Sequence, residues 1–264
     1  MSVALAGGRE CQDLAILGTG RAFLESGVTT IRDAGWTPAG IRRVFARGEF
    51  AGPRVQVSIM PLSITGGHGD GMTPSGIDLN AGPPESELPP GVADGPDEVR
   101  RVVRRQIGAG ADWIKVMATG GVFSLLDASD AVQYTVDEIR VMVEEADAAG
   151  IHGVMAHAEN ARGIKAALRA GVRSIEHGNG IDGEAIDLMH ERDVPLVPTF
   201  LVSEEMLRED LGSLEPGRIA DLVLVDFDPL TEPACWRDPA RLVAVVQGSR
   251  VISARDGTRT RRSI

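Results

Sequence analysis

The chain has 264 residues, and its 27 lysine and arginine residues against 38 aspartate and glutamate residues give a net charge of −11. This length corresponds to one large domain or two small ones. A hydrophobic fraction of 43% excludes wholesale disorder, which requires few apolar residues. The acidic balance argues against nucleic acid as a partner, because that binding depends on clustered lysine and arginine side chains.

The cysteine content and the hydropathy pattern indicate the cellular location of the protein. Cys11 and Cys235 are too few for a disulfide framework, and neither lies in a metal-binding spacing. No stretch approaches the roughly 18 apolar residues that a membrane-spanning helix needs. The short apolar run at the start also lacks the basic flank of a signal peptide. We therefore expect a cytoplasmic protein without a membrane partner.

Short β-rich runs alternate with helical patterns along most of the chain. The first pattern, 10–25, is helical, so we reject its Gly18-Thr19-Gly20 as a dinucleotide-binding motif because no strand precedes it. Several β-rich runs are almost continuously apolar, as in parallel strands covered on both faces. The six predicted strands are 28–32, 54–60, 113–117, 153–157, 172–176 and 194–200.

Helices are predicted between these strands. Residues 96–108 carry a valine stripe at helical spacing, and Thr135 with Glu138 forms a capping box ahead of the next helix. Two further helices are predicted at 161–170 and 182–192. This alternation predicts a parallel α/β fold, either an open doubly wound sheet or a (β/α) barrel.

The pattern changes in the last fifth of the chain. Residues 219–226 and 242–253 are both of β type, and no helix of comparable quality lies between them. We therefore predict two domains, 1–211 and 212–264, of which the second is a small β appendage.

Three of the five histidines follow or end predicted strands. His157 and His177 are separated by one βα unit, so in a parallel barrel both would project from the carboxyl ends of neighbouring strands into one mouth. Two such imidazoles suit a single metal ion. A histidine considered alone is more often structural. His68 lies in a long loop, 61–95, at a position where α/β folds place functional residues.

Lysine is rare here, since Lys115 and Lys165 are the only two among 27 cationic residues. Lys115 lies within the apolar run 113–117, where an unpaired ammonium group is costly. One interpretation is a salt bridge, for example with Asp112, or a side chain that extends to the barrel mouth. The other is a desolvated, nucleophilic amine that reacts with carbon dioxide and becomes a carbamate, an anion able to bind a divalent metal.

Several runs resemble the metal-dependent amidohydrolase superfamily, and within it the imidazolonepropionase-like and Xaa-Pro or Xaa-Arg dipeptidase-like branch. The runs are GVTTIRD at 27–33, TGGHG at 65–69, DWIKVMATGG at 112–121, AHAEN at 156–160, SIEHG at 174–178 and GSLEPGRIADLV at 212–223. The resemblance implies a (β/α)8 barrel with a flanking β-sandwich. It also implies hydrolysis of carbon–nitrogen bonds in small amides, cyclic amides or dipeptides.

The resemblance further implies roles for individual residues. Lys115 resembles the carboxylated lysine of the family, and His157 and His177 resemble the two histidines that bind the second metal ion. We expect this ion to be zinc, with carbon dioxide present as the carbamate of Lys115. Loops that line the substrate pocket in such enzymes here contain His68, Gln133 and Tyr134.

Two features of such enzymes are missing from this sequence. No His-x-His pair, which in these enzymes ends the first barrel strand and binds the first metal, occurs anywhere. The aspartate after the eighth strand, which acts as general base, is also missing, because Phe200 is followed after about a dozen residues by Gly212-Ser213-Leu214. The six predicted strands then correspond to the second to the seventh. We expect an incomplete barrel whose open wedge favours a homo-oligomer, with a β-sandwich remnant at its end.

The sequence thus predicts a hydrolase in which metal-activated water attacks a carbonyl, with activity impaired by the missing aspartate. The alternative is a non-catalytic remnant or binding module that retains the scaffold. That alternative predicts less than one metal ion per chain and an unmodified Lys115.

Overall fold

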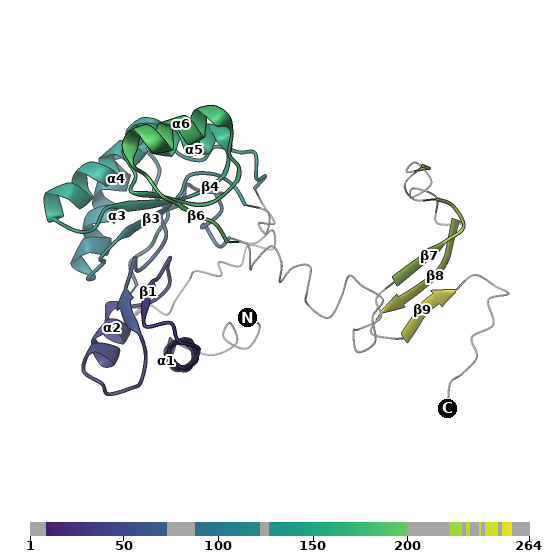
Figure 1. Cartoon of the computed structure of the whole chain (residues 1–264), viewed down its shortest axis with the longest axis horizontal. Coiled ribbons are helices and arrows are strands. Elements are labelled where there is room, and N and C mark those ends of the chain that lie inside the picture. Colours follow the sequence, from purple (N-terminus) through teal and green to yellow (C-terminus); the bar gives the residue numbers. More distant parts are fainter. Residues whose placement is uncertain are drawn as a thin grey trace. The chain divides into compact units, whose positions relative to one another are not determined.

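The computed structural model describes residues 9–72, 88–121, 127–199, 222–228, 231–232, 238, 241–247 and 250–254. The chain divides into two compact units, Met1–Pro198 and Thr199–Ile264 (Figure 1). The domain boundary predicted at 211/212 lies outside the described residues. Within the described part of the chain, no helix combines the length and the apolar character needed to cross a membrane.

The first unit is built on parallel strands in chain order. β1 pairs with β2, and β3 to β6 form a four-stranded sheet in which each strand is parallel to its neighbours. Leu62, which follows β2, lies beside β3: its N–H donates to the Lys115 carbonyl at 2.8 Å, and its carbonyl accepts the Met117 N–H at 2.9 Å. The predicted α/β fold with parallel strands is therefore confirmed. The strands are β1 (Thr30–Arg32), β2 (Arg54–Gln56), β3 (Ile114–Met117), β4 (Val154–Asn160), β5 (Ser174–Gly180) and β6 (Leu196–Val197).

Helices α3 to α6 cover one face of the four-stranded sheet, each packed against the next (Figure 1). α1 includes Gly18-Thr19-Gly20, in agreement with the rejection of a nucleotide-binding loop. α2 was not predicted, because it is only 8 residues long and Pro38 at its N-cap makes no side-chain cap. The helices are α1 (Arg9–Glu25), α2 (Ala39–Ala46), α3 (Pro96–Gly108), α4 (Val136–Ala149), α5 (Ala161–Ala170) and α6 (Gly183–Arg192).

Side-chain caps fix where three helices of this layer, α4, α5 and α6, begin. The predicted capping box is present: the Thr135 side chain accepts from the Glu138 N–H, and the Glu138 carboxylate accepts from the Thr135 N–H at 2.8 Å. Asn160 and Asp182 accept backbone N–H groups in the first turns of α5 and α6, both at 2.9 Å. Because β4 ends at Asn160, this cap also fixes the point where the strand gives way to the helix.

Side chains of β3 and β4 alternate between the helical layer and the opposite face, which we call the inner face. Val116 and Ala156 are fully buried in the hydrophobic core beneath the helices. Lys115 and His157 occupy the alternate positions and therefore point to the inner face. In the strand register Lys115 lies opposite Met155, two residues before His157. The inner face thus carries buried polar groups.

The second unit contains an antiparallel sheet of β7 (Leu222–Val225), β8 (Leu242–Gln247) and β9 (Arg250–Ala254). The predicted β-type run at 242–253 is two strands, because β8 pairs with β9 in antiparallel orientation. The predicted sandwich remnant stays a prediction.

Removal of the capping box tests how much it stabilises the fold. We expect Thr135→Ala to lower the free energy of unfolding by about 1 kcal/mol, since an orphaned helix N–H loses its acceptor. Thr135→Ser keeps the hydroxyl and is the matched control. Urea unfolding followed by circular dichroism measures both, and equal stability of the two variants would contradict the assignment.

Candidate metal site and its charged surroundings

Three side chains of metal-binding type gather at the carboxyl ends of β4 and β5. His157 and Glu159 lie two residues apart on β4, so both point to the inner face, and His177 comes from β5. One ligand atom from each of the three lies within 4.8 Å of the others. The rings of His157 and His177 are 4.7 Å apart between centroids, at an interplanar angle of 67°. The structure thus brings the two predicted histidines together and adds Glu159.

His177 reaches this site through an unusual backbone conformation. On β5, Glu176 points to the inner face, where it contacts Arg32, whereas Ile175 lies in the core beneath the helices. Simple alternation would turn His177 toward the helices with Ile175. Its φ of 71° is instead left-handed, which is uncommon outside glycine, and the pairing with β4 shifts register directly after it. Irregularities of this kind redirect a side chain next to a functional site.

Both imidazoles are uncharged at neutral pH. Burial, followed by the nearby charge of Lys115, lowers the pKa of His157 to about 2 and that of His177 to about 4. A neutral imidazole keeps a lone pair for a metal ion. The Nε2 atom of His157 lies 3.1 Å from the Gly120 carbonyl oxygen, and a proton donated there leaves the lone pair on the other ring nitrogen.

Lys115 lies deeper on the same inner face, with only 3% of its surface exposed. Burial lowers its pKa to about 8, and the negative charge of Glu176 opposes that shift. A substantial fraction of the Lys115 amine is therefore uncharged at a pH just above neutral. Asp112, the partner considered from the sequence, pairs with Arg42 and accepts the Val57 N–H at 2.9 Å.

Arg32 on β1 holds Glu176 on β5. Its Nη2 donates to both carboxylate oxygens, at 2.8 and 3.0 Å, and its Nη1 donates to Ser174 Oγ at 2.6 Å. The guanidinium also lies 5.0 Å from the centroid of the Trp113 ring. In a flat sheet, four strand spacings would separate β1 from β5 by about 19 Å. The contact therefore requires a sheet curled toward its inner face, as in a barrel.

His68 stacks on His157 with ring centroids 4.5 Å apart. Gln133 fixes this arrangement, since its Oε1 accepts the His68 N–H at 3.1 Å and its Nε2 donates to Asp127 at 2.7 Å. The same Asp127 oxygen lies 3.7 Å from His68 Nδ1. Gly121 permits the approach, because a Cβ atom there would lie 2.2 Å from the imidazole ring. His68 thus lies at the site, and Gln133 holds it in place through its hydrogen bonds to the His68 N–H and to Asp127.

Tyr134 is located in the hydrophobic core of the first unit, with 1% of its surface exposed. Its hydroxyl donates to the Ala93 carbonyl at 3.0 Å. This contact stabilises the entry to α4. The role of Tyr134 in substrate binding stays a prediction.

Glu159, Asp127 and Arg32 are site residues that the sequence interpretation did not assign. A signal existed for Glu159, because His157-Ala158-Glu159 places two ligand-type side chains on one face of a strand. The contacts of Arg32 with Glu176 and of Asp127 with His68 join segments that are distant in sequence, and no local pattern indicates them.

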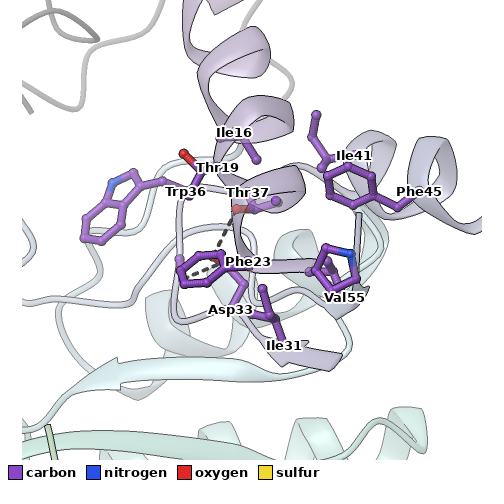
Figure 2. A pocket seen from close by; sticks show the side chains of 13 residues that line it. Ile16, Thr19, Phe23, Ile31, Asp33, Trp36, Thr37, Ile41, Phe45 and Val55 are labelled. Atoms are coloured by element: carbon purple, nitrogen blue, oxygen red, sulfur yellow. Dashed lines mark hydrogen bonds between the residues drawn. The ribbon is translucent and has the colours of Figure 1, made fainter. Parts of the chain in front are cut away.

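A separate cavity of about 270 Å³ lies between α1, α2 and the first two strands (Figure 2). Ile31, Asp33 and Val55 line it. The Asp33 carboxylate accepts the Thr37 hydroxyl at 3.0 Å, and burial raises its pKa to about 6. Arg32, which lies between Ile31 and Asp33 in the sequence, points to the inner face, so the cavity lies on the other side of β1 from the histidine site.

Comparison with known proteins gives one family and several relatives. Residues 9–210 match the model described as Amidohydrolase family. Over 192 residues the chain is 39% identical to the ochratoxinase of Aspergillus niger, which covers 70% of this chain and 40% of that protein. The chain thus spans about 40% of the length of the curated relatives it matches.

Solved structures resemble the chain over most of its length. The crystal structure of A. niger ochratoxinase has a TM-score of 0.70 at 27% identity and covers 96% of this chain and 78% of its own. A prolidase complexed with N-methylphosphonate-L-proline has a TM-score of 0.68 at 30% identity, with coverages of 96% and 82%. A Xaa-Pro dipeptidase with bound methionine has a TM-score of 0.66 at 25% identity, with coverages of 93% and 80%.

The Arg32–Glu176 pair is testable through stability. Glu176 has only 8% of its side chain exposed, so Arg32→Met leaves a buried carboxylate without its main partner. We expect a loss of about 3 kcal/mol in the free energy of unfolding, and a smaller loss when Glu176→Gln is added. Arg54→Met, at an exposed position of β2, is the control and should change stability by less than about 0.5 kcal/mol. Urea unfolding at pH 7 measures all variants, and a double variant as unstable as the single one would contradict the pairing.

Proposed function

The chain belongs to the amidohydrolase family, and from this premise we propose that it is a metal-dependent hydrolase of carbon–nitrogen bonds. The observation that carries the proposal is the cluster at the carboxyl ends of β4 and β5, where ligand atoms of His157 and His177 converge. Parallel α/β folds place their active sites at such strand ends. The relatives named ochratoxinase and prolidase support a small amide or a dipeptide as the substrate.

The residues of this site fit a divalent metal ion. Two imidazoles that burial keeps neutral offer nitrogen ligands, and zinc prefers nitrogen and oxygen donors at about 2.0–2.2 Å. We propose that His157 and His177 hold the ion, with Lys115 as a further ligand in its carbamate form. The carbamate forms when the neutral amine bonds to the carbon of carbon dioxide and loses one proton. A bound ion would supply Lewis acidity for the carbonyl and for the attacking water.

The surrounding residues are proposed to position the substrate and to balance charge. His68 stacks on His157 and so limits the space above the site, while Gln133 holds the His68 backbone. Arg32 neutralises Glu176 and thereby leaves the Lys115 amine less tightly bound to that carboxylate. We include His68, Gln133 and Tyr134 in the proposed substrate-binding set.

We also propose that turnover is reduced. The sequence has no His-x-His pair and no aspartate in the context expected for the general base.

The six parallel strands would then be the second to the seventh of an incomplete barrel, with domains at 1–211 and 212–264 and a β-sandwich remnant in the second. We also propose a homo-oligomer that forms across the open side, in a cytoplasmic protein.

Metal analysis tests the site directly. We expect the purified chain, after loading with zinc and gel filtration, to retain about one ion per molecule. His157→Ala and His177→Ala should each lose it, while His190→Ala, at an exposed position of α6, should retain it. Elemental analysis by mass spectrometry gives the stoichiometry. A wild-type chain that retains no metal would favour the non-catalytic binding module.

An activity assay tests the impairment. We expect hydrolysis of Xaa-Pro dipeptides and of ochratoxin A at least about 100-fold slower than by a prolidase or ochratoxinase assayed in parallel, because general-base assistance contributes about 10²–10⁴ in rate. Liquid chromatography of the products measures the rates. Turnover equal to that of those enzymes would contradict the predicted impairment.

A further inference from the structure

We propose that Glu159 is itself a ligand of the metal ion, so that His157, Glu159 and His177 each donate one ligand atom to it. This inference rests on the proposed function, because it concerns the same ion. It adds a carboxylate from β4 to the proposed ligands.

The positions of the three ligand atoms support this assignment. They already lie within 4.8 Å of one another, a spacing that a single ion at about 2.0–2.2 Å from each donor can bridge with small side-chain movements. His157 and Glu159 are separated by one residue on a single strand, so their backbones are fixed relative to each other. His177 faces them from β5, where Ala158 is its partner in the strand register. All three ligands therefore come from two hydrogen-bonded strands.

The Glu159 carboxylate is already oriented by its neighbours. Asn179 Nδ2 donates to Glu159 Oε2 at 2.6 Å, which leaves lone pairs on Oε1 for an ion. Asn179 lies two residues after His177, so the strand that supplies the second histidine also supplies the group that holds the carboxylate. The Glu159 N–H donates to Thr119 Oγ1 at 2.9 Å and fixes the backbone at this point. Metal-binding carboxylates are commonly held by such hydrogen bonds.

Lys115 occupies a different level of the inner face. It lies opposite Met155, two residues before His157, which corresponds to about 6.6 Å along the strand. The charges that act on its amine are those of Glu176, Arg32 and Glu159. Its amine nevertheless acts on the site, since the charge of Lys115 contributes to the lowered pKa of His157 and of His177. Lys115 therefore stays the further ligand of the proposed function.

Competition between the metal-free chain and a chromophoric zinc chelator tests the inference, because it measures affinity without any activity. We expect Glu159→Gln to weaken zinc binding by at least about 100-fold and Asn179→Ala by about 10-fold. Glu191→Gln, at an exposed position of α6, is the matched control and should bind as the wild type does.

The outcomes separate this inference from the proposed function. Wild-type affinity in Glu159→Gln, together with loss of zinc in His157→Ala, would overturn the role of Glu159 and leave the histidine site intact. The visible spectrum of the cobalt form is a second measurement: different bands in wild type and Glu159→Gln support the inference, and the same bands in both contradict it. A wild-type chain that binds no zinc refutes both proposals.

Discussion

The candidate site depends on the backbone conformation of one residue. His177 has a φ of 71°, and Gly178 follows with a φ of 68°, so two consecutive residues leave the extended conformation of β5. A left-handed non-glycine residue costs on the order of 1–3 kcal/mol and persists only where its surroundings enforce it. Here the pairing of β5 with β4 and the contact of the His177 ring with His157 supply that constraint. Without this turn, His177 would point with Ile175 into the helical layer.

Curvature of the sheet determines the charges beneath the site. Because β1 approaches β5 across the inner face, the Arg32 guanidinium reaches Glu176 and binds both of its carboxylate oxygens. Glu176 is therefore shared between two cations, and the Lys115 amine is left without an exclusive counter-ion. An amine in this position, desolvated and only partly neutralised, is poised between its charged and uncharged forms near physiological pH. Burial, followed by the charge of Lys115, keeps the two imidazoles neutral.

Local signals in the sequence predicted much of the fold. The capping residues Thr135 and Glu138 and the apolar strands are patterns within a few residues, and the structure has them where the sequence indicated. The convergence of His157 and His177 followed from the βα period, because parallel strands align their carboxyl ends. The Arg32–Glu176 contact spans 144 residues and depends on curvature, which no local pattern encodes. His177 points to the inner face only because the backbone leaves the regular strand conformation there. In the sequence, the adjacent Gly178 is the only sign of this irregularity.

Metal binding and catalytic power are separable in this architecture. The ligands of the candidate site come from β4 and β5. These two strands are paired with each other, and each is followed by a helix, α5 or α6. The family features that this sequence lacks belong to other barrel strands and supply the first metal site and the general base. The three ligand-type side chains come from neighbouring strands, so the geometry of the proposed site does not depend on those features. The proposed enzyme would hold an ion that polarises a carbonyl while it lacks the group that moves the proton, and its rate would then be limited by proton transfer more than by metal affinity.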